Sequence, residues 1–167
     1  MSAAFASPWA ATVLRLVLAG VLGVAGALKL PDPDAAVRAV RAYRLLPEPV
    51  AQVVGLGLPV LEVAVAVLLL VGLVTRVAAV LTVVLMVVFV AGVASAWARG
   101  LSIDCGCFGG GGEVAASQTR YPQEIARDLA LLAAAALLAW RPTSRLSLDA
   151  ALSSEHPRTT VTQGASS

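Results

Sequence analysis

Residues 77–98 form a long run without a charged side chain, and this feature limits what the chain can fold into. A helix of that length, at about 1.5 Å per residue, crosses the hydrocarbon core of a bilayer, which is about 30 Å thick. Residues 10–28 and 50–74 are similarly apolar and contain one charge each, Arg15 and Glu62. The sequence therefore predicts that these three ranges span the lipid bilayer as helices.

A fourth span is predicted at residues 125–140, where Arg127 and Asp128 stand in the first turn before an apolar run. Hydrophobic residues make up 59% of the chain and charged residues 13%, whereas soluble domains contain roughly 45–50% and about 25%. We expect an all-α, multi-pass membrane protein, with a four-transmembrane-helix bundle over residues 1–142. The polar residues 143–167 lack a core pattern, and we expect them to form a disordered tail.

Between the first two spans, residues 35–46 combine apolar and basic side chains, which predicts a short interfacial helix on the membrane surface. Pro31 ends the first span because proline cannot continue a helix, and Asp34 is the expected cap of the next helix. The short helix carries three arginines that we expect to reach toward lipid headgroups, namely Arg38, Arg41 and Arg44.

Glu62 lies near the middle of the second span, where an ionised carboxylate costs at least about 3 kcal/mol. We expect Glu62 to be protonated, to face a polar cavity or to pair with a cation, and Arg15 is the natural partner. Such a pair would fix the register of two helices, and proton handling or ligand binding by Glu62 is the alternative. A transport pathway through Arg15 and Glu62 is less well supported, because helices without polar stripes offer little lining for one.

The chain's only cysteines, Cys105 and Cys107, lie one residue apart in the polar loop 99–123. Such a pair can close only a small, strained ring, and strain makes a disulfide easier to reduce. The spacing therefore favours thiol-disulfide exchange over a structural bond. Phe108 and the glycine run 109–112 follow, which predicts a flexible segment that makes Cys107 the easier cysteine to reach.

The surroundings of the cysteines leave their reactivity open. Asp104 opposes thiolate formation at Cys105, whereas Arg99 and Arg120 favour it. Two thiolates make half of a tetrahedral zinc site, and the nearby candidates for a third ligand are Asp104 and Glu113. A metal site would therefore need a partner protein or a dimer, so we predict no metal, and no cofactor is evident. A metal-binding pair and an inert pair remain the alternatives.

Other functional classes lack support in the sequence. The basic residues stand at the ends of the apolar segments, where membrane topology explains them, so we expect no nucleic-acid binding. The single histidine, His156, lies in the polar tail and supplies neither a catalytic triad nor a histidine-rich metal cluster inside the bundle.

Several short segments form a succession along the chain: residues 25–34, 43–47, 59–62, 72–76, 103–109 and 127–128. This succession resembles the MauE/DoxX family of redox-associated integral membrane proteins over roughly residues 10–141. The most specific element is Cys-Gly-Cys-Phe-Gly at 105–109. The resemblance implies a four-helix membrane protein in which Cys105 and Cys107 match the family's cysteine pair and Glu62 its intramembrane carboxyl.

The resemblance also implies a function. MauE-type members support correct disulfide formation in the small subunit of methylamine dehydrogenase, and DoxX-type members are linked to membrane oxidoreductase assemblies. We therefore expect a plasma (inner) membrane protein whose cysteines exchange disulfides with a partner protein. The supporting residues are expected to be Asp104, Phe108, Glu62, Arg15, Arg127 and Asp128.

Two further expectations accompany this function. A quinone near Glu62 is a candidate electron acceptor, by analogy with other four-helix disulfide-forming membrane proteins. The alternative function is a non-enzymatic membrane scaffold of an oxidoreductase complex, in which the Cys-x-Cys loop docks a partner or binds a metal.

The charges and the redox chemistry disagree about which membrane face carries the cysteines. Both termini are expected on one side, and more basic residues lie on the cysteine side than on the terminal side, which places the cysteines in the cytoplasm. Disulfide formation favours the opposite face, because the cytosol keeps thiols reduced. The family resemblance favours the outward-facing arrangement.

Overall fold

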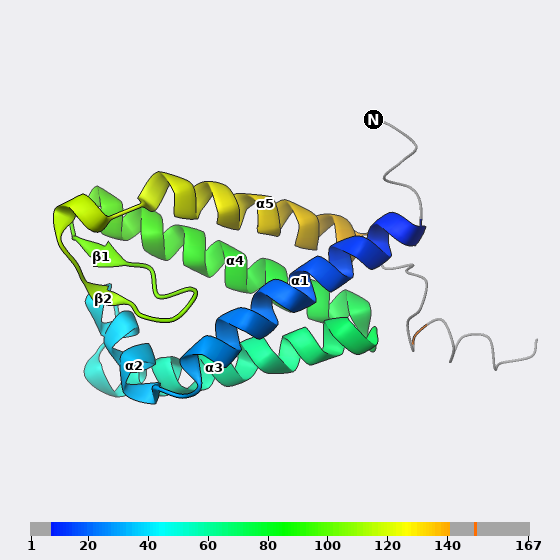
Figure 1. The fold of residues 1–167 in the computed structure, drawn as a ribbon, viewed down its shortest axis with the longest axis horizontal. Helices are drawn as coiled ribbons and strands as arrows, with labels where there is room; N and C mark the ends of the chain where they lie inside the picture. Colours follow the sequence, from blue (N-terminus) through cyan, green and yellow to red (C-terminus); the bar gives the residue numbers. More distant parts are fainter. Residues whose placement is uncertain (1–7, 141–148, 150–167) are drawn as a thin grey trace, which may run out of the picture.

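The computed structural model describes residues 8–140 and residue 149, and this part of the chain is mostly helical (Figure 1). The helices are α1 (Pro8–Lys29), α2 (Pro33–Ala42), α3 (Glu48–Val71), α4 (Thr75–Ala98) and α5 (Tyr121–Trp140). Between α4 and α5 lie the short antiparallel strands β1 (Ile103–Asp104) and β2 (Gly112–Glu113) and a short 3-10 helix, η2 (Ala116–Gln118).

Helices α1, α3 and α4 are long and apolar enough to cross a membrane by length and composition. Large apolar side chains such as Val53, Val60 and Val88 stay exposed on them, as lipid-facing side chains do. These helices coincide with the predicted spans 10–28, 50–74 and 77–98 to within a few residues. Helix α5 forms as expected but is more polar near its start, so its role as a fourth span stays a prediction.

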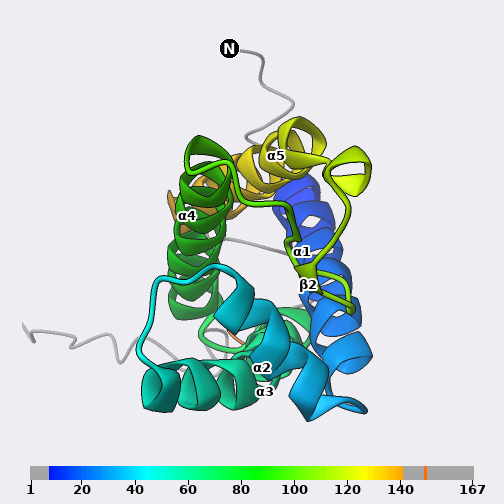
Figure 2. The ribbon, with the colours of Figure 1, turned by 90° about the vertical axis from the view of Figure 1, so that its left-hand side faces the viewer.

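The four long helices run lengthwise beside one another, with α2 and the small sheet at one end (Figures 1 and 2). Helix α1 packs mainly on α3, and α4 packs mainly on α5. Their shared core is aliphatic and includes Leu18, Leu22, Leu69, Met86 and Leu138. The bundle therefore presents one closed end, formed by the connections 30–47 and 99–120, where the cysteines lie.

Helices α1 and α3 approach closely because α1 carries glycine at the contact. A Cβ atom added to Gly26 would lie 2.8 Å from the Pro59 carbonyl oxygen and 2.7 Å from Val63 Cγ2. One turn earlier, a Cβ on Gly23 would make an ordinary 3.6 Å contact with Ala66. The contact pairs residues in antiparallel order, and this register decides which polar side chains meet.

Helix α2 confirms the predicted short amphipathic helix, with a different cap. Asp32, not Asp34, precedes the helix, and its Oδ1 accepts a hydrogen bond from the Ala35 N–H at 2.9 Å. The helix ends at Ala42, because Arg44 adopts a positive φ of 51°. The three arginines are exposed and form ion pairs with carboxylates: Arg38 with Asp32, Arg41 with Glu48, and Arg44 with Glu113.

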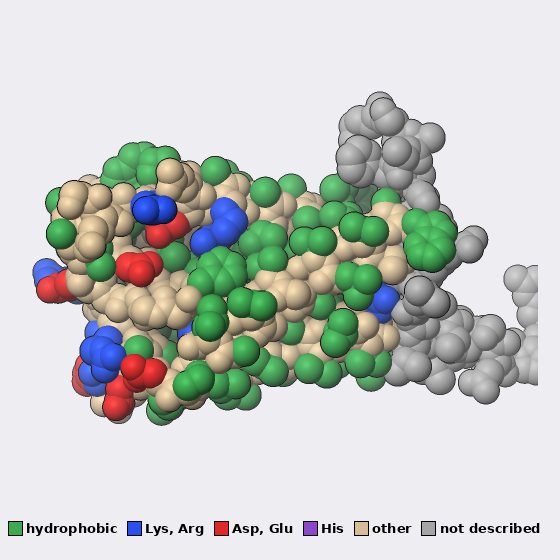
Figure 3. All heavy atoms as spheres, viewed as in Figure 1, with side chains coloured by type: hydrophobic (Ala, Val, Ile, Leu, Met, Phe, Trp, Pro, Cys, Tyr) green, Lys and Arg blue, Asp and Glu red, His purple; other side chains and the backbone are tan. Residues whose placement is uncertain are grey.

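Charged side chains gather at the end of the molecule that carries α2 and the sheet (Figure 3). Hydrophobic side chains cover much of the helical surface beyond that end in the same view. This separation is the pattern expected when lipid surrounds the helices and water or headgroups contact one end. The cysteine loop therefore belongs to the polar end.

At the opposite end, one residue of the polar C-terminal segment contacts the bundle. The Asp149 carboxylate accepts hydrogen bonds from the backbone N–H groups of Val74 and Thr75, both at 2.9 Å. These groups begin α4 and have no partner within the helix, so Asp149 supplies the cap. The other residues of the predicted tail 143–167 lie outside the described part of the chain.

The close α1–α3 contact predicts that Gly26→Ala destabilises the bundle. The added methyl group meets backbone, which cannot rotate away, so we expect a loss of about 1–3 kcal/mol in the free energy of unfolding. Gly20→Ala on the same helix is the matched control, because nothing lies within 4 Å of its Cβ position. Thermal unfolding in one detergent compares the two variants, and equal melting temperatures would contradict the packing described.

Candidate functional site

The loop that carries the cysteines packs against α2. Gly106 and Gly111 have φ values of 69° and 89°, which side chains other than glycine rarely adopt. A Cβ on Gly106 would lie 2.8 Å from the Cβ of Ala39, and one on Gly111 would collide with the same methyl group. At Gly106 and Gly111, the absence of a side chain therefore allows the loop to pack closely against α2, and the flexibility of the segment stays a prediction.

Both tyrosines of the chain bind the backbone of this loop, a role that no sequence pattern predicted. The Tyr43 hydroxyl donates to the Cys105 carbonyl at 3.0 Å. The Tyr121 hydroxyl donates to the Leu101 carbonyl at 2.6 Å and accepts from the Ile103 N–H at 2.9 Å. The cysteines are therefore positioned from two helices, because Tyr43 follows α2 and Tyr121 begins α5.

The two cysteines differ in exposure, and in the opposite sense to the prediction. Cys107 is buried, with 6% of its surface exposed, whereas Cys105 is half-buried. Cys105 is therefore the cysteine that a partner reaches more easily.

Hydrogen bonds around Cys105 favour its thiolate form. The Cys107 thiol donates to Cys105 and lowers the Cys105 pKa below its ordinary value, although burial acts in the opposite direction. The Cys107 N–H also donates to Cys105 Sγ at 3.3 Å. The same donation, together with burial, raises the pKa of Cys107. These contacts therefore favour the thiolate form at Cys105 and the protonated form at Cys107.

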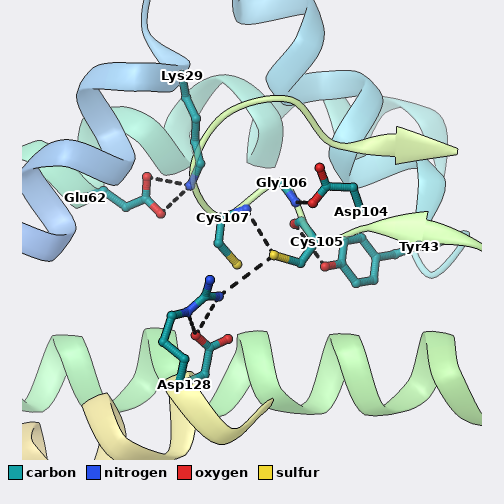
Figure 4. A network of polar contacts seen from close by, with 9 residues as sticks. Lys29, Tyr43, Glu62, Asp104, Cys105, Gly106, Cys107 and Asp128 are labelled. Atoms are coloured by element: carbon teal, nitrogen blue, oxygen red, sulfur yellow. Dashed lines mark hydrogen bonds and ion pairs between the residues drawn. The ribbon is translucent and has the colours of Figure 1, made fainter. Parts of the chain in front are cut away.

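Helix α5 contributes the cation of the site (Figure 4). Arg127 Nη2 lies 3.9 Å from Cys105 Sγ and 2.8 Å from Asp128 Oδ1. The guanidinium also stacks over the Phe108 ring, 4.8 Å from its centroid. Arg127, Asp128 and Phe108, which the sequence indicated as supporting residues, therefore lie together beside the cysteines.

The arginines closer in sequence do not take this place. The Arg99 guanidinium donates instead to the backbone carbonyls of Ser95, at 3.2 Å, and Tyr43. Asp104 turns back on the loop, where its Oδ1 accepts from the Gly106 N–H at 3.2 Å. The positive charge beside the Cys105 sulfur thus comes from Arg127, a residue 22 positions after Cys105.

Glu124 also faces the cysteines, and the sequence analysis missed it. Ligand-capable atoms of Asp104, Cys105 and Glu124 lie within 4.8 Å of one another. The Arg127 guanidinium already lies beside the sulfur, and a second cation there would be repelled. This arrangement suits hydrogen bonding to the thiol better than metal binding. Glu113, the other predicted candidate for a metal ligand, pairs with Arg44 at the surface.

Glu62 has a different partner from the one predicted. Lys29 Nζ donates to both of its carboxylate oxygens, at 2.6 and 2.8 Å, and both side chains are buried (Figure 4). Lys29 lies at the closed end of α1, next to the cysteine loop, where α3 brings Glu62 in antiparallel register. Arg15 lies about four turns away, near the α3–α4 connection and within electrostatic reach of Asp149.

Beneath the cysteine loop lies a small cavity of about 20 Å³. Its lining includes Glu62, Cys107, Phe108, Arg127 and Asp128. That volume holds about one water molecule and does not fit a quinone ring. The residues present therefore do not support the quinone site expected near Glu62.

The fold and site together define a class: a helical multi-pass membrane protein that holds a polarised dithiol at the polar end of its bundle. The family model described as methylamine utilisation protein MauE matches residues 7–141, so the chain belongs to the MauE family. It is 41% identical over 105 residues to the methylamine utilization protein MauE of Paracoccus denitrificans. That alignment covers 62% of this chain and 56% of the relative. No solved structure matches.

The Lys29–Glu62 pair predicts a large effect when only one partner is removed. Lys29→Met leaves a carboxylate buried without a counterion, so we expect the free energy of unfolding to fall by about 3–5 kcal/mol. The double variant Lys29→Met, Glu62→Leu should recover most of that loss, since both charges are gone. Additive losses in a double-mutant cycle, measured by denaturant unfolding in detergent, would contradict the pairing.

The polarised thiols predict the pH dependence of Cys105 alkylation. In the native chain the midpoint should lie below that of an ordinary thiol, about 8.5. Cys107→Ala removes the donating thiol, so the midpoint should rise and alkylation at neutral pH should slow. Iodoacetamide labelling followed by mass spectrometry measures both. Arg120→Gln is the control, and an unchanged midpoint in Cys107→Ala would refute the assignment.

Proposed function

We propose that this protein exchanges disulfides with a partner protein at the membrane surface, using Cys105 as the attacking thiol and Cys107 as the resolving thiol. The observation that carries the proposal is the asymmetry of the pair. Cys105 is the more exposed cysteine, and its Sγ accepts from the Cys107 N–H and lies 3.9 Å from Arg127 Nη2, whereas Cys107 is buried. An exchange reaction requires these two different roles.

In the first step, the Cys105 thiolate attacks a disulfide of the partner. A mixed disulfide forms between Cys105 and one partner sulfur, and the other partner sulfur leaves as a thiolate. That thiolate can attack a different disulfide of the partner, and a final partner thiolate displaces Cys105. The cycle rearranges disulfides without net oxidation, so it consumes no external electron acceptor.

Cys107 releases the partner when no partner thiolate displaces Cys105 from the mixed disulfide. Its thiol loses a proton and attacks Cys105 Sγ, which closes the Cys105–Cys107 disulfide and releases the partner's second sulfur. Two electrons pass to the partner, whose disulfide becomes two thiols, while the two cysteines are oxidised. The reverse sequence returns the disulfide to a partner that holds two thiols, so the small strained ring acts as a carrier.

The membrane setting of the reaction is part of the proposal. We place the protein in the plasma membrane with α5 as a fourth span, supported by its length and by its packing along α4. The cysteine end faces outward, where disulfides persist. Because the chain aligns with just over half the length of its curated relative, the partner is also proposed: a disulfide-containing protein of methylamine utilisation.

The proposal predicts opposite results for the two cysteine substitutions. Cys107→Ser removes the resolving thiol, so a mixed disulfide between Cys105 and the partner should accumulate and appear as a higher-mass band on a non-reducing gel. Cys105→Ser removes the attacking thiol, so that band should be absent. Cells are quenched with a thiol-blocking reagent before lysis, and mass spectrometry identifies the linked cysteine.

A membrane-impermeant maleimide applied to the same intact cells checks the orientation, since only outward-facing Cys105 is labelled before lysis. A band that persists in Cys105→Ser, or one absent from both variants, would refute the exchange proposal. If both variants instead lose the partner from the membrane whatever the redox conditions, the scaffold function described above replaces it.

A further inference from the structure

Asp128 is a buried carboxylate whose two oxygens differ. Only 2% of the residue is exposed. Oδ1 accepts from Arg127 Nε and Nη2 at 2.9 and 2.8 Å, whereas Oδ2 is buried without a hydrogen-bond partner within the described residues. A buried carboxylate oxygen that accepts nothing is costly. Its position suggests that it serves a step of the reaction.

Asp128 and Cys107 line the same small cavity. Figure 4 shows the Cys107 sulfur directed toward the side of the loop where Asp128 lies. On α5, Asp128 is one turn after Glu124, so the two carboxylates lie on the same helix face; Glu124 lies near Cys105, and Asp128 lines the same cavity as Cys107. Each thiol therefore has its own acidic neighbour.

The other charged groups around the cavity are already engaged. Both oxygens of Glu62, on α3, accept from Lys29 at the end of α1. Arg127 is shared between Asp128 and Cys105. The lining residues from α4, Met86 and Phe89, are apolar. Glu124 Oε2 is also buried without a hydrogen-bond partner within the described residues, but the cavity lining includes Asp128 and not Glu124. Asp128 Oδ2 is thus the carboxylate oxygen of this lining that is placed to accept a proton.

We propose that Asp128 accepts the proton of Cys107 when Cys107 resolves the mixed disulfide, an inference that rests on the proposed exchange function. The Cys107 S–H bond breaks, the proton passes to Asp128 Oδ2, and the resulting thiolate attacks Cys105 Sγ. The Cys105–Cys107 disulfide forms, and the partner sulfur leaves as a thiolate. The proton on Asp128 then neutralises the released thiolate or passes to water, which restores the carboxylate.

A buried thiol needs such an acceptor because water cannot take its proton easily. Cys107 is 6% exposed, and the cavity holds about one water molecule. Proton transfer to a positioned side chain typically contributes about 10²- to 10⁴-fold to a rate. Loss of Asp128 should therefore slow the resolving step and should not slow the attack by Cys105.

The test uses the full chain in detergent and an aromatic disulfide reagent that releases a coloured thiolate. Attack by Cys105 releases the first equivalent, and resolution by Cys107 releases the second. In Asp128→Asn, we expect the second phase to slow by about 10²-fold at neutral pH, whereas the first phase should not slow, because Arg127 remains beside Cys105. Raising the pH should restore the second phase, since hydroxide then replaces the carboxylate.

Glu113→Gln is the matched control. Glu113 lies on β2, and its exposed carboxylate pairs with Arg44. Both phases should be native in this variant. An unchanged second phase in Asp128→Asn would overturn the inference while leaving the exchange function intact. A first phase that is absent, or that survives Cys105→Ser, would instead overturn the proposed function.

The native chain gives a second measurement that does not depend on the folding of Asp128→Asn. With an internal acceptor, the rate of the second phase should be nearly independent of pH between about pH 6 and 8. Without one, that rate should rise about tenfold per pH unit, because only the thiolate attacks. A tenfold rise per unit in the native chain would overturn the inference.

Discussion

The buried ion pair between Lys29 and Glu62 is the interaction on which the site depends. In an apolar bundle neither charge is tolerated alone, so the pair holds α1 and α3 in one register. That register brings the closed end of α1 beneath the cysteine loop and makes the floor of the small cavity. The lipid environment requires only that the helices are long and apolar. The ion pair sets the position of α1 along the axis of α3.

Above that floor, close packing rather than covalent bonds fixes the cysteines. Glycines with positive φ let the loop lie against Ala39, and Tyr43 and Tyr121 bind its backbone from two sides. The result is a dithiol whose sulfurs differ in exposure and in proton affinity although they are two residues apart. A flexible loop would average such differences away, so the asymmetry depends on the rigidity of the loop.

The sequence was informative where one physical constraint acts alone. Hydrocarbon excludes charge, so residues 77–98 predicted α4 closely, and the Cys-x-Cys spacing located the candidate site. It was misleading where the answer depends on packing between distant segments. Arg15 is the charged residue inside the first predicted span, so the sequence made it the expected partner of Glu62. The antiparallel packing of α1 on α3 instead places Lys29 beside Glu62. The glycines after Cys107 suggested slack, and their contact with Ala39 is not visible in local sequence.

The contact of Asp149 with the start of α4 has a practical consequence for how the protein is handled. A residue beyond the last helix supplies acceptors to the free N–H groups of Val74 and Thr75, so the end of α4 remote from the cysteines is completed from the C-terminal segment. Expression vectors that trim this segment back to Trp140, or replace it with an affinity tag, remove that acceptor. An affinity tag at the C-terminus should therefore be attached after residue 149.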